Sequence, residues 1–489
     1  MSGNETVATE DAGSGAPAPA SPPPRPAGRF DRSIVDGPLG AAVWKIAWPT
    51  MLTNVVGGLQ GIVDHAMVGH IVGYRANAAI GVALQIFIAI IVFINSLFIG
   101  MSVLVARFAG AGDHDKVDRT VYQAFLTAIA LALAVMAPIG WWLSPSLLDL
   151  MNAAPEVRSE ALPYLRIMFL FSVGMLLFYM LSGALRSAGD ARTPMVLGIA
   201  MTVLNLVLNV LLIGGFGPIP AYGTAGAAIG TVIASGAVGL YAMVRLWRGK
   251  LVVSFPRSGF GPDWDVIRAL FRFGLPSGIQ GIAMNVGGVL LLAYIGSLAT
   301  SAEAQAAFAV SYSQLFSLVT WTSLGLMGAA AAVAGQNLGA GKPDRAEHSV
   351  HLAARFGLGG AAVVGAAFLF APGALLALFG LTDPLVVQIG TQLLRVLSVS
   401  GLFVAVALTY TGGLQGTGDT RSPLFISIAS QIVVPLGICF VLVRTTGLTA
   451  LGIWLAILAG HFTRCMLSIA RFRQGRWRRI EVDIAPAKS

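Results

Sequence analysis

The sequence consists largely of apolar stretches about as long as a membrane is thick. Residues 195–213 read "MVLGIAMTVLNLVLNVLLI", without a single charge, and similar stretches recur along the 489-residue chain. A hydrocarbon core about 30 Å thick needs roughly 20 apolar residues for each helical span. Only 11% of the residues are charged, against about 25% in soluble domains. The sequence therefore predicts an all-α integral membrane protein in contact with the lipid bilayer.

Breaks at charged residues, Gly and Pro divide the chain into twelve predicted transmembrane helices. Pro49 and Pro276 lie near the starts of the first and the seventh, where they are candidate kink points. The basic residues concentrate at both ends and in the loops between even- and odd-numbered helices. The positive-inside rule then places both termini in the cytoplasm and the chain in the cytoplasmic (inner) membrane as a multi-pass protein. The predicted spans are 43–71, 78–107, 117–143, 157–186, 194–214, 223–247, 265–298, 303–336, 346–371, 385–414, 422–444 and 449–471.

The second half of the chain repeats the first at a constant interval. "LRSAGDARTP" (185–194) returns as "LQGTGDTRSP" (414–423), and "GAGDHDK" (110–116) returns as "GAGKPDR" (339–345). Each copy holds six helices, and an even number preserves the direction of insertion. We therefore predict two pseudo-symmetric six-helix lobes, 40–250 and 262–474, related as parallel repeats. Such repeats are typical of secondary transporters.

Loop and terminal residues have simpler interpretations. Gly189 and Gly418 suit left-handed helix ends, and Thr193-Pro194 and Ser422-Pro423 suit the N-cap and first turn of the next helix. Loop architecture is the favoured reading, with a gating role as the alternative. Residues 1–33 are rich in Pro and Ala without periodicity and predict a disordered cytoplasmic tail; residues 475–489 predict a second cytoplasmic tail.

Charge and cysteine content exclude several classes of protein. The net charge of +9 could suggest nucleic acid as a partner, but the basic residues lie in loops and at the chain ends rather than in one patch. We expect no nucleic-acid partner. Cys439 and Cys465 both fall in apolar runs, so neither a disulfide framework nor a metal spacing is present in the sequence. No resident cofactor or metal is expected.

One carboxylate stands apart from the other acidic residues, most of which lie in loops or at span ends. Asp64, in "GGLQGIVDHAMVGH" (57–70), is about twenty residues into the first span. A central Asp costs about 2.5–3.5 kcal/mol on insertion scales. It is tolerated where the group is partnered, protonated or facing water, and such acids usually mark ion or proton sites. The alternative is a structural carboxylate that bonds neighbouring polar groups.

Polar side chains on the fifth span are candidate partners for this carboxylate. Thr202, Asn205 and Asn209 fall on one face of a helix. Two amides and a hydroxyl provide oxygen ligands for a cation or N–H donors for a carboxylate; the alternative is hydrogen bonding between helices. His461, alone on the last span, is expected to be structural. Other polar or flexible side chains within the spans form a candidate substrate cleft, with packing as the alternative: Gln60, Gln280, Met284, Asn285, Tyr312, Gln314 and Tyr410.

Four sequence motifs together resemble those of the multidrug and toxic compound extrusion (MATE) family. They are "GIVDHAMVGH" in the first span, the "LRSAGDARTP" loop, "NLVLN" in the fifth span and "GTAGAAIGT" (223–231) opening the sixth. The likeness covers about residues 40–472. It implies two six-helix lobes that alternate between inward- and outward-facing states, and export of organic cations and other amphipathic compounds in exchange for protons or sodium ions. The family's ion-coupling positions fall on Asp64, Asn205, Asn209, Thr231, Ala227 and Tyr164, with Thr202 beside them.

Two departures from the family pattern bear on the coupling ion. The second fifth-helix position is often Asp in prokaryotic members but is Asn209 here. The Glu of NorM-type and eukaryotic branches, on the seventh helix, is replaced by Met284. The resemblance therefore implies an ion site confined to the N-terminal lobe, as in DinF-like members, and favours protons over sodium. Protonation of Asp64 would break its bonds to the asparagines, shift the first helix about Pro49 and release substrate outward.

The resulting expectation is a monomeric proton-coupled antiporter for small-molecule drugs or toxic metabolites, and no enzyme. A sodium-coupled antiporter, with Na⁺ held by Asp64, Asn205 and Asn209, is one alternative. A flippase for lipids or lipid-linked glycans from the related superfamily is another. The flippase reading is weaker because the arginines noted near the spans lie at their ends: Arg107, Arg166, Arg268, Arg272 and Arg395. A channel or an intramembrane enzyme finds little support.

Overall fold

The structure is a computed structural model that describes residues 29–256 and 259–484. Within that part of the chain the secondary structure is almost entirely helical, apart from an isolated bridge between Phe216 and Ile219. The expected tail at residues 1–28 lies outside the described residues. The helices are α1 (Ser33–Asp36), α2 (Leu39–Ile71), α3 (Tyr74–Ala111), α4 (His114–Leu131), the π-helical segments η1 (Ala132–Met136) and η2 (Ile139–Leu143), α5 (Ser144–Leu150), α6 (Pro155–Leu170), α7 (Val173–Ser187), α8 (Arg192–Ile213), α9 (Gly223–Trp247), α10 (Trp264–Gly296), α11 (Ser301–Phe308), the π-helical η3 (Ala309–Leu315), α12 (Ser317–Gly339), α13 (Pro343–Phe370), α14 (Pro372–Ala377), α15 (Pro384–Thr417), α16 (Arg421–Ile428), the π-helical η4 (Ala429–Val433), α17 (Val434–Arg444), α18 (Ala450–Arg473) and the short 3₁₀ segment η5 (Arg476–Arg479).

These elements group into the twelve spans that the sequence predicts. Ten helices in the described part of the chain are long and apolar enough to cross a membrane, and the α6–α7 pair makes an eleventh. The remaining span is α2, which is 33 residues long but carries polar side chains along its second half. One detail differs from the prediction: the fourth span is not one straight helix, because α6 and α7 meet at an angle of 53°. Both predicted kink prolines, Pro49 and Pro276, lie inside continuous helices.

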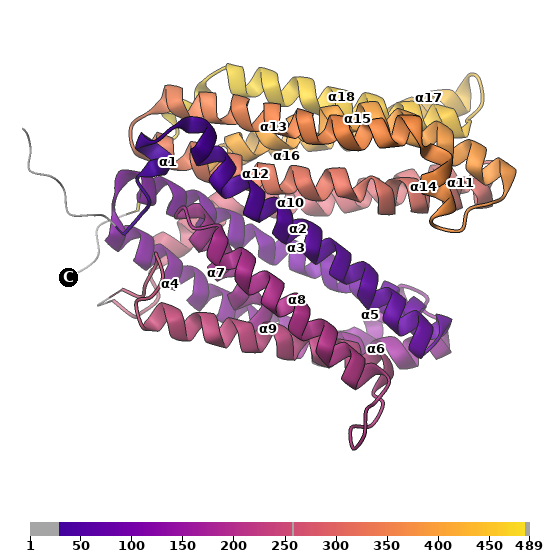
Figure 1. The fold of residues 1–489 in the computed structure, drawn as a ribbon, viewed down its shortest axis with the longest axis horizontal. Helices are drawn as coiled ribbons and strands as arrows, with labels where there is room; N and C mark the ends of the chain where they lie inside the picture. Colours follow the sequence, from indigo (N-terminus) through magenta and orange to yellow (C-terminus); the bar gives the residue numbers. More distant parts are fainter. Residues whose placement is uncertain (1–28, 257–258, 485–489) are drawn as a thin grey trace, which may run out of the picture.

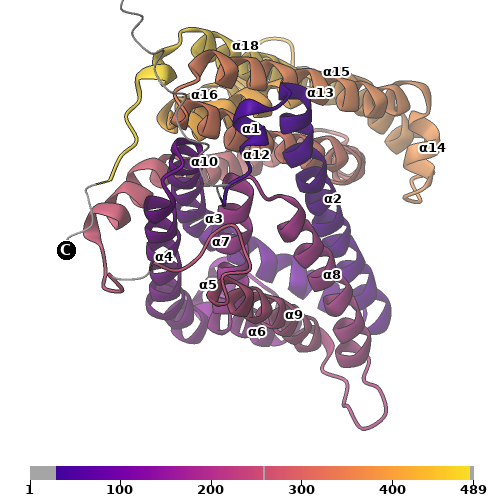
Figure 2. The same cartoon turned by 60° about the vertical axis from the view of Figure 1, so that its left-hand side comes forward.

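The helices form two bundles that follow the internal repeat. Helices α2–α9 make the N-terminal lobe and α10–α18 the C-terminal lobe, drawn from indigo to magenta and from magenta to yellow in Figure 1. The lobes meet at the end of the molecule that carries α1 and the last described residues, and they diverge toward the opposite end. We call the first of these ends the closed end. Figure 2 shows the two bundles from the side, with α10 and α12 between the outer helices of the C-terminal lobe and α3.

Glycines bring the two lobes into backbone contact at the closed end. A side chain at Gly110 of α3 would overlap the carbonyl oxygen of Gln336 on α12, and one at Gly339 of α12 would overlap that of Arg107 on α3. Both members of the second contact are the repeat equivalents, 229 residues away, of the members of the first. The lobes therefore meet about a local two-fold axis. Gln336 also donates from Nε2 to the carbonyl oxygen of Ser187 at 2.7 Å.

The repeated Gly-Asp loops are helix-capping structures, as predicted, although their caps differ in detail. Gly189 and Gly418 have φ values of 103° and 102°, in the left-handed region that favours glycine. The predicted caps Thr193 and Ser422 instead lie inside the following helices. The preceding aspartates accept from their backbone N–H groups, Asp190 Oδ1 at 3.0 Å and Asp419 Oδ1 at 3.1 Å.

The end of the predicted N-terminal tail is ordered across the closed end. Residues 29–36, which we call the N-terminal strap, begin with Arg29, whose guanidinium pairs with Asp118 of α4. Ile34 in α1 is fully buried among residues of α2 and α12. Asp36 Oδ1 accepts from Lys342 Nζ at 2.6 Å. The boundary predicted at residue 33 is therefore wrong for residues 29–33, which pack against both lobes.

The last described residues run across the closed end from the C-terminal lobe to the N-terminal lobe. Residues 476–484, the C-terminal strap, begin against the C-terminal lobe, where Trp477 stacks on Phe472, and end on the N-terminal lobe. Trp477 is buried (1% exposed), and the carbonyl of Ile480 accepts from Arg107 of α3 at 3.2 Å. Asp483 Oδ1 accepts from Lys116 Nζ at 2.7 Å. Within the predicted cytoplasmic tail at 475–489, these residues are therefore packed against the protein and tie the two lobes together.

Candidate functional site

The intramembrane carboxylate lies against the polar face of α8. Asn209 Nδ2 donates to Asp64 Oδ1 at 2.8 Å and also lies 3.3 Å from Asn205 Oδ1. Both asparagines are buried, at 0% and 1% exposed, whereas Asp64 is half-buried. The i, i+4 spacing of the asparagines presents both amides to one point on α2. The structure therefore brings together the three side chains that the sequence singled out.

Three further residues extend this contact into a network across three helices. Gln60, one turn before Asp64 on α2, donates from Nε2 to Asn205 Oδ1 at 2.9 Å and accepts from Thr202 Oγ1 at 2.7 Å. On α9, Thr231 Oγ1 accepts from Asn205 Nδ2 at 3.1 Å and donates to the carbonyl of Ala227 at 3.0 Å. We call Gln60, Asp64, Thr202, Asn205, Asn209 and Thr231 the Asp64 network. Gln60 was predicted in the substrate cleft; its amide is held within the network, and it is not among the residues that line the cavity described below.

The amide of Asn205 has different partners in its two possible orientations. With oxygen and nitrogen exchanged, Asn205 Nδ2 lies 3.2 Å from Asp64 Oδ1 and donates to it, while its oxygen accepts from Thr231 Oγ1 at 3.1 Å. The exchanged orientation gives the carboxylate two amide donors instead of one, but it also turns Asn205 Nδ2 toward the amide nitrogens of Gln60 and Asn209, at 2.9 and 3.3 Å, so those two bonds are lost unless these amides rotate as well. Rotation of a buried amide would thus change how strongly the network stabilises the ionised form of Asp64.

One acceptor in the network has no partner. Asn209 Oδ1 is buried and without a hydrogen bond among the described residues, and it is directed toward α9, where a side chain at Gly230 would collide with it. An unsatisfied buried acceptor costs about 1–3 kcal/mol. The amide is therefore held with its N–H group toward Asp64 even though its oxygen loses a partner.

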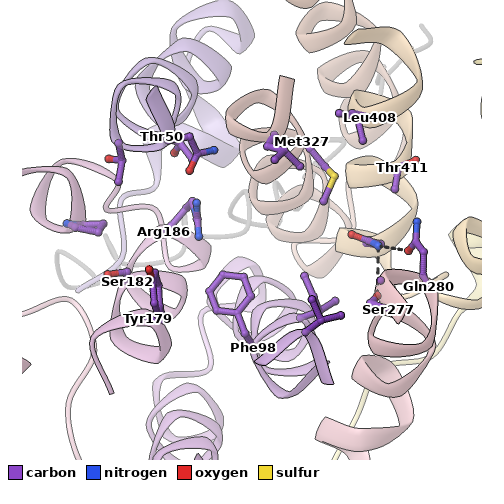
Figure 3. Close-up of a pocket in the computed structure, with 18 of the residues that line it drawn as sticks. Thr50, Phe98, Tyr179, Ser182, Arg186, Ser277, Gln280, Met327, Leu408 and Thr411 are labelled. Atoms are coloured by element: carbon purple, nitrogen blue, oxygen red, sulfur yellow. Dashed lines mark hydrogen bonds between the residues drawn. The ribbon is translucent and has the colours of Figure 1, made fainter. Parts of the chain in front are cut away.

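A cavity of about 550 Å³ lies between the two lobes (Figure 3). Helices α2, α3, α7 and the start of α8 contribute one wall, and α10, α12, α15 and α18 the other. Gln280 and Met284, both predicted in the substrate cleft, line it. Most of the wall is apolar, and the amide of Gln280 donates to Ser427 Oγ at 2.7 Å. The lining residues are Thr50, Thr53, Asn54, Val92, Phe98, Ile99, Phe178, Tyr179, Ser182, Arg186, Ala191, Pro194, Ser277, Gln280, Gly281, Met284, Leu324, Met327, Leu408, Thr411, Gln415 and Arg464.

Two arginines in this wall were missed in the sequence analysis. Neither Arg186, at the end of the fourth predicted span (157–186), nor Arg464 in "HFTRCML" was considered as a site residue. A signal was available for Arg464, because it lies nine residues before the end of the last span, and charges within a span usually mark function. Arg186 could not be found in this way. It is the last residue of the predicted fourth span, and a shift of that boundary by one residue would assign it to the loop instead.

Four other predicted cleft residues lie away from the cavity. Tyr410 is buried in the C-terminal lobe, its ring centroid 5.4 Å from that of Phe472. Tyr312 stacks on Phe308 at 4.8 Å and borders a separate cavity of about 80 Å³ inside the C-terminal lobe, beside His461. Asn285 bonds to the backbone of its own helix through Gly281, at 3.0 Å. Gln314 is exposed and outside the cavity lining.

The last predicted coupling residue, Tyr164, is buried in the core of the N-terminal lobe on α6. Among the described residues it forms no hydrogen bond with the Asp64 network. Tyr164 nevertheless lies close enough to Asp64 for an electrostatic interaction between the two side chains, so the structure places it near the network, as predicted, but not hydrogen-bonded to it.

Helix α2 connects the Asp64 network to the cavity. Thr50, Thr53 and Asn54 line the cavity, and Asp64 lies about three turns further along the same helix. Between them, a side chain at Gly58 would collide with the ring of Trp321 on α12, and Asn54 Nδ2 donates to the carbonyl of Trp321 at 3.4 Å. One helix thus contacts the carboxylate network, the cavity and the opposite lobe.

Two repeated helical lobes around a shared cavity, with a carboxylate network inside one of them, are the architecture of a secondary membrane transporter. The family model MatE matches residues 49–211 and again residues 276–441. The chain belongs to the MatE family, which consists of transporters rather than enzymes. The two matches fall one in each lobe, as the internal repeat requires.

Curated relatives and solved structures agree with this assignment. The chain is 30% identical over 450 residues to a probable multidrug resistance protein NorM of Deinococcus radiodurans, covering 88% of this chain and 94% of the relative. Identity to the multidrug export protein MepA of Staphylococcus aureus is 27% over 430 residues, covering 86% and 91%. A multidrug resistance MATE family transporter solved in an outward-facing conformation is 22% identical, with a TM-score of 0.85 and coverage of 92% and 98%. These likenesses confirm the predicted family and fold, and the DinF-like branch stays a prediction.

Proposed function

We propose that this protein exports amphipathic organic compounds across the cytoplasmic membrane in exchange for protons, by alternating access. Its termini lie in the cytoplasm, so the closed end faces the cytoplasm and the described state is outward-facing. The observation that carries the proposal is the position of α2, which joins an intramembrane carboxylate to the wall of the central cavity. The bacterial homologues named as multidrug resistance or export proteins support the direction of transport.

The first step is a change in the charge of Asp64. While it is ionised, the carboxylate accepts from Asn209 Nδ2 at 2.8 Å and, in the exchanged orientation, from Asn205 Nδ2 at 3.2 Å. Hydrogen bonds to a charged acceptor are worth about 1.5–3 kcal/mol each, and bonds between neutral groups about half as much. Protonation therefore weakens the attachment of α2 to α8.

The second step transmits this change to the lobe interface. Since α2 also contacts Trp321 of the opposite lobe through Gly58 and Asn54, a shift of α2 away from α8 alters the cavity wall and the interface together. A bound compound that contacts Thr50 or Thr53 would lose part of its site in this step. Proton entry from outside is thereby coupled to release of the compound, and loss of the proton to the cytoplasm restores the starting state.

The donor set around Asp64 favours protons over sodium ions. Asn209 offers an N–H group to the carboxylate, and the oxygen of Asn205 already accepts from Gln60 and Asn209, whereas Na⁺ needs free oxygen ligands. Asn209 Oδ1 points the other way, toward Gly230, so a sodium ion beside Asp64 requires rotation of that amide. A proton requires no new ligand. The single carboxylate also supplies less charge than a sodium site with two.

Transport from proteoliposomes tests this proposal. Purified protein would be reconstituted in liposomes, and movement of a fluorescent amphipathic compound followed under an imposed pH gradient, then under a sodium gradient. Export by the wild type under the pH gradient alone, and none by Asp64→Asn, is the expected result. Glu156→Gln, a loss of charge in the exposed first turn of α6, is the matched control and should transport normally. A wild type driven only by sodium, or an active Asp64→Asn, would contradict proton coupling through Asp64.

A further inference from the structure

The central cavity carries positive charge without a matching carboxylate. Among its described lining residues, Arg186 and Arg464 carry a formal charge, and the others are apolar, hydroxyl- or amide-bearing. Asp64 lies outside the lining, within its network in the N-terminal lobe. A cationic compound in this cavity would face two guanidinium groups and no counter-charge.

Arg186 comes from the N-terminal lobe and reaches toward the other. Its guanidinium carbon lies 5.6 Å from the ring centroid of Phe98, and its Nη1 atom lies 3.4 Å from the point where a side chain at Gly328 of α12 would begin. Figure 3 shows it directed into the space between the lobes. No described residue forms an ion pair or hydrogen bond with it. The nearby loop aspartate, Asp190, caps α8 through Thr193.

Arg464 faces the same cavity from the C-terminal lobe. It is 9% exposed, and its Nε atom is buried without a hydrogen-bond partner among the described residues. On the loop before α16, Asp419 is engaged instead by Arg471, at 2.9 Å. The two cavity arginines therefore come from opposite lobes. The loop aspartate of each lobe has another partner: Asp190 accepts from the backbone of Thr193, and Asp419 pairs with Arg471.

Two unpaired arginines in a largely apolar cavity are costly for folding alone, because a buried charge without a partner loses its hydration. Guanidinium groups recognise carboxylates, sulfonates and phosphates through paired N–H donors. Around them, Phe98, Phe178 and Leu408 offer apolar surface for the body of a ligand. The site thus has the two parts that an amphipathic anion requires.

We propose that the central cavity binds amphipathic organic anions, with the anionic group held by Arg186 and Arg464 and the apolar body against the aromatic and aliphatic wall. The proposal deepens the export function and rests on it for the direction of transport. Because the two arginines belong to different lobes, movement of one lobe relative to the other changes the distance between them, and with it the affinity for an anion that contacts both. The anion could be a soluble compound or the headgroup of a lipid, and the recognition chemistry is the same for both.

Binding of two xanthene dyes of opposite charge tests the proposal. Fluorescein is an anion and tetramethylrhodamine methyl ester a cation on the same ring system. Fluorescence anisotropy with purified protein in lipid nanodiscs would give an affinity for each. Fluorescein should bind more tightly, and Arg186→Gln and Arg464→Gln should each weaken its binding about 10- to 100-fold. The cationic dye should bind the variants at least as well as the wild type.

Control variants distinguish an effect of the cavity charge from an effect of misfolding and from an effect of the net charge of the protein. Arg272→Gln removes an exposed arginine of α10 that does not line the cavity, and it should bind fluorescein like the wild type. Arg186→Lys and Arg464→Lys keep the charge but lose the paired donors, and they should fall between the wild type and the Gln variants. Each variant would be checked for monodispersity and helicity before binding is measured.

Two transport arms identify the source of the anion and separate this proposal from export. Export of fluorescein from proteoliposomes reports a soluble anion, and dithionite-accessible movement of NBD-labelled phosphatidylglycerol between leaflets reports a lipid; loss of either signal in the Arg variants supports the proposal. Arginine-dependent binding without movement of any probe would uphold the anion site and refute the export function. Export of the cationic dye with no fluorescein binding, or fluorescein binding that is unaffected by both Gln variants, would overturn the anion site.

Discussion

The backbones of α3 and α12 pack so closely at the closed end that adding a single methyl group there tests how much this contact stabilises the closed end. A methyl group at Gly339 would overlap the carbonyl oxygen of Arg107, and one at Gly110 that of Gln336. A backbone carbonyl inside a helix cannot rotate away, so the two helices must move apart. Overpacking of this kind costs about 1–3 kcal/mol, and the cost falls only on the state in which the closed end is closed.

A cost of this size shifts the balance between the two transporter states by about 5- to 150-fold toward the state with the closed end open. The assay uses a cysteine at Ser187, which is 4% exposed at this interface, in a background without Cys439 and Cys465. Its rate of alkylation by a hydrophilic maleimide reports how often the closed end opens. Gly339→Ala and Gly110→Ala should each raise this rate.

The matched control is Gly360→Ala on α13, where a new methyl group meets nothing within 4 Å. That variant should leave the alkylation rate unchanged. If Gly339→Ala and Gly110→Ala alkylate no faster than Gly360→Ala, the closed end does not depend on these contacts and the reasoning is wrong. Faster alkylation accompanied by loss of helicity would instead indicate unfolding, which circular dichroism distinguishes.

Three further predictions follow from the network and the straps. Asn209→Leu removes the donor at 2.8 Å from Asp64 and should cut pH-driven transport at least tenfold with normal expression, whereas Asn209→Asp adds a second carboxylate and should make transport respond to sodium; both are read in proteoliposomes. Deleting residues 476–484 removes the Lys116–Asp483 pair at 2.7 Å and the burial of Trp477, and should raise alkylation at the closed end without abolishing transport. The straps should also be insensitive to mild acid: hydrogen bonds from Lys342 and Lys116 hold the pKa values of Asp36 and Asp483 below their ordinary range, so their contribution is present above the unfolded pKa and is lost only as the pH falls through the lower folded values. Alkylation of the Ser187 cysteine that rises already between neutral and mildly acidic pH in an Asp64→Asn background would contradict this last prediction.

The twelve spans and the repeat could be predicted because each depends on local or periodic features. Apolar length defines a span, and a constant interval of 229 residues defines the lobes. The contact of Asp64 with Asn205 and Asn209 was also predictable, because a lone intramembrane carboxylate requires a partner and the polar face of α8 was visible in the spacing. What the sequence does not contain is the relative rotation of the helices.

Rotation explains the errors at the site. Gln60 and Asp64 are one turn apart, so both face α8, but nothing in the spacing favours that face over the cavity for Gln60. Tyr312 and Tyr410 lie on cavity-forming lobes but on faces that turn into the C-terminal lobe. The straps were missed for another reason: short segments such as residues 29–36 and 476–484 are ordered by long-range contacts with Asp118, Arg107 and Lys116, which composition does not reveal.

Infrared difference spectroscopy tests the central claim, that Asp64 is the group that takes up the proton. Purified protein in lipid would be titrated from alkaline to acidic conditions while the C=O stretch of protonated carboxyl groups is recorded. We predict a band that appears on mild acidification in the wild type, is reversed on addition of transported substrate, and is absent in Asp64→Asn. A band of equal size in Asp64→Asn, or a wild-type spectrum unaffected by substrate, would contradict the claim.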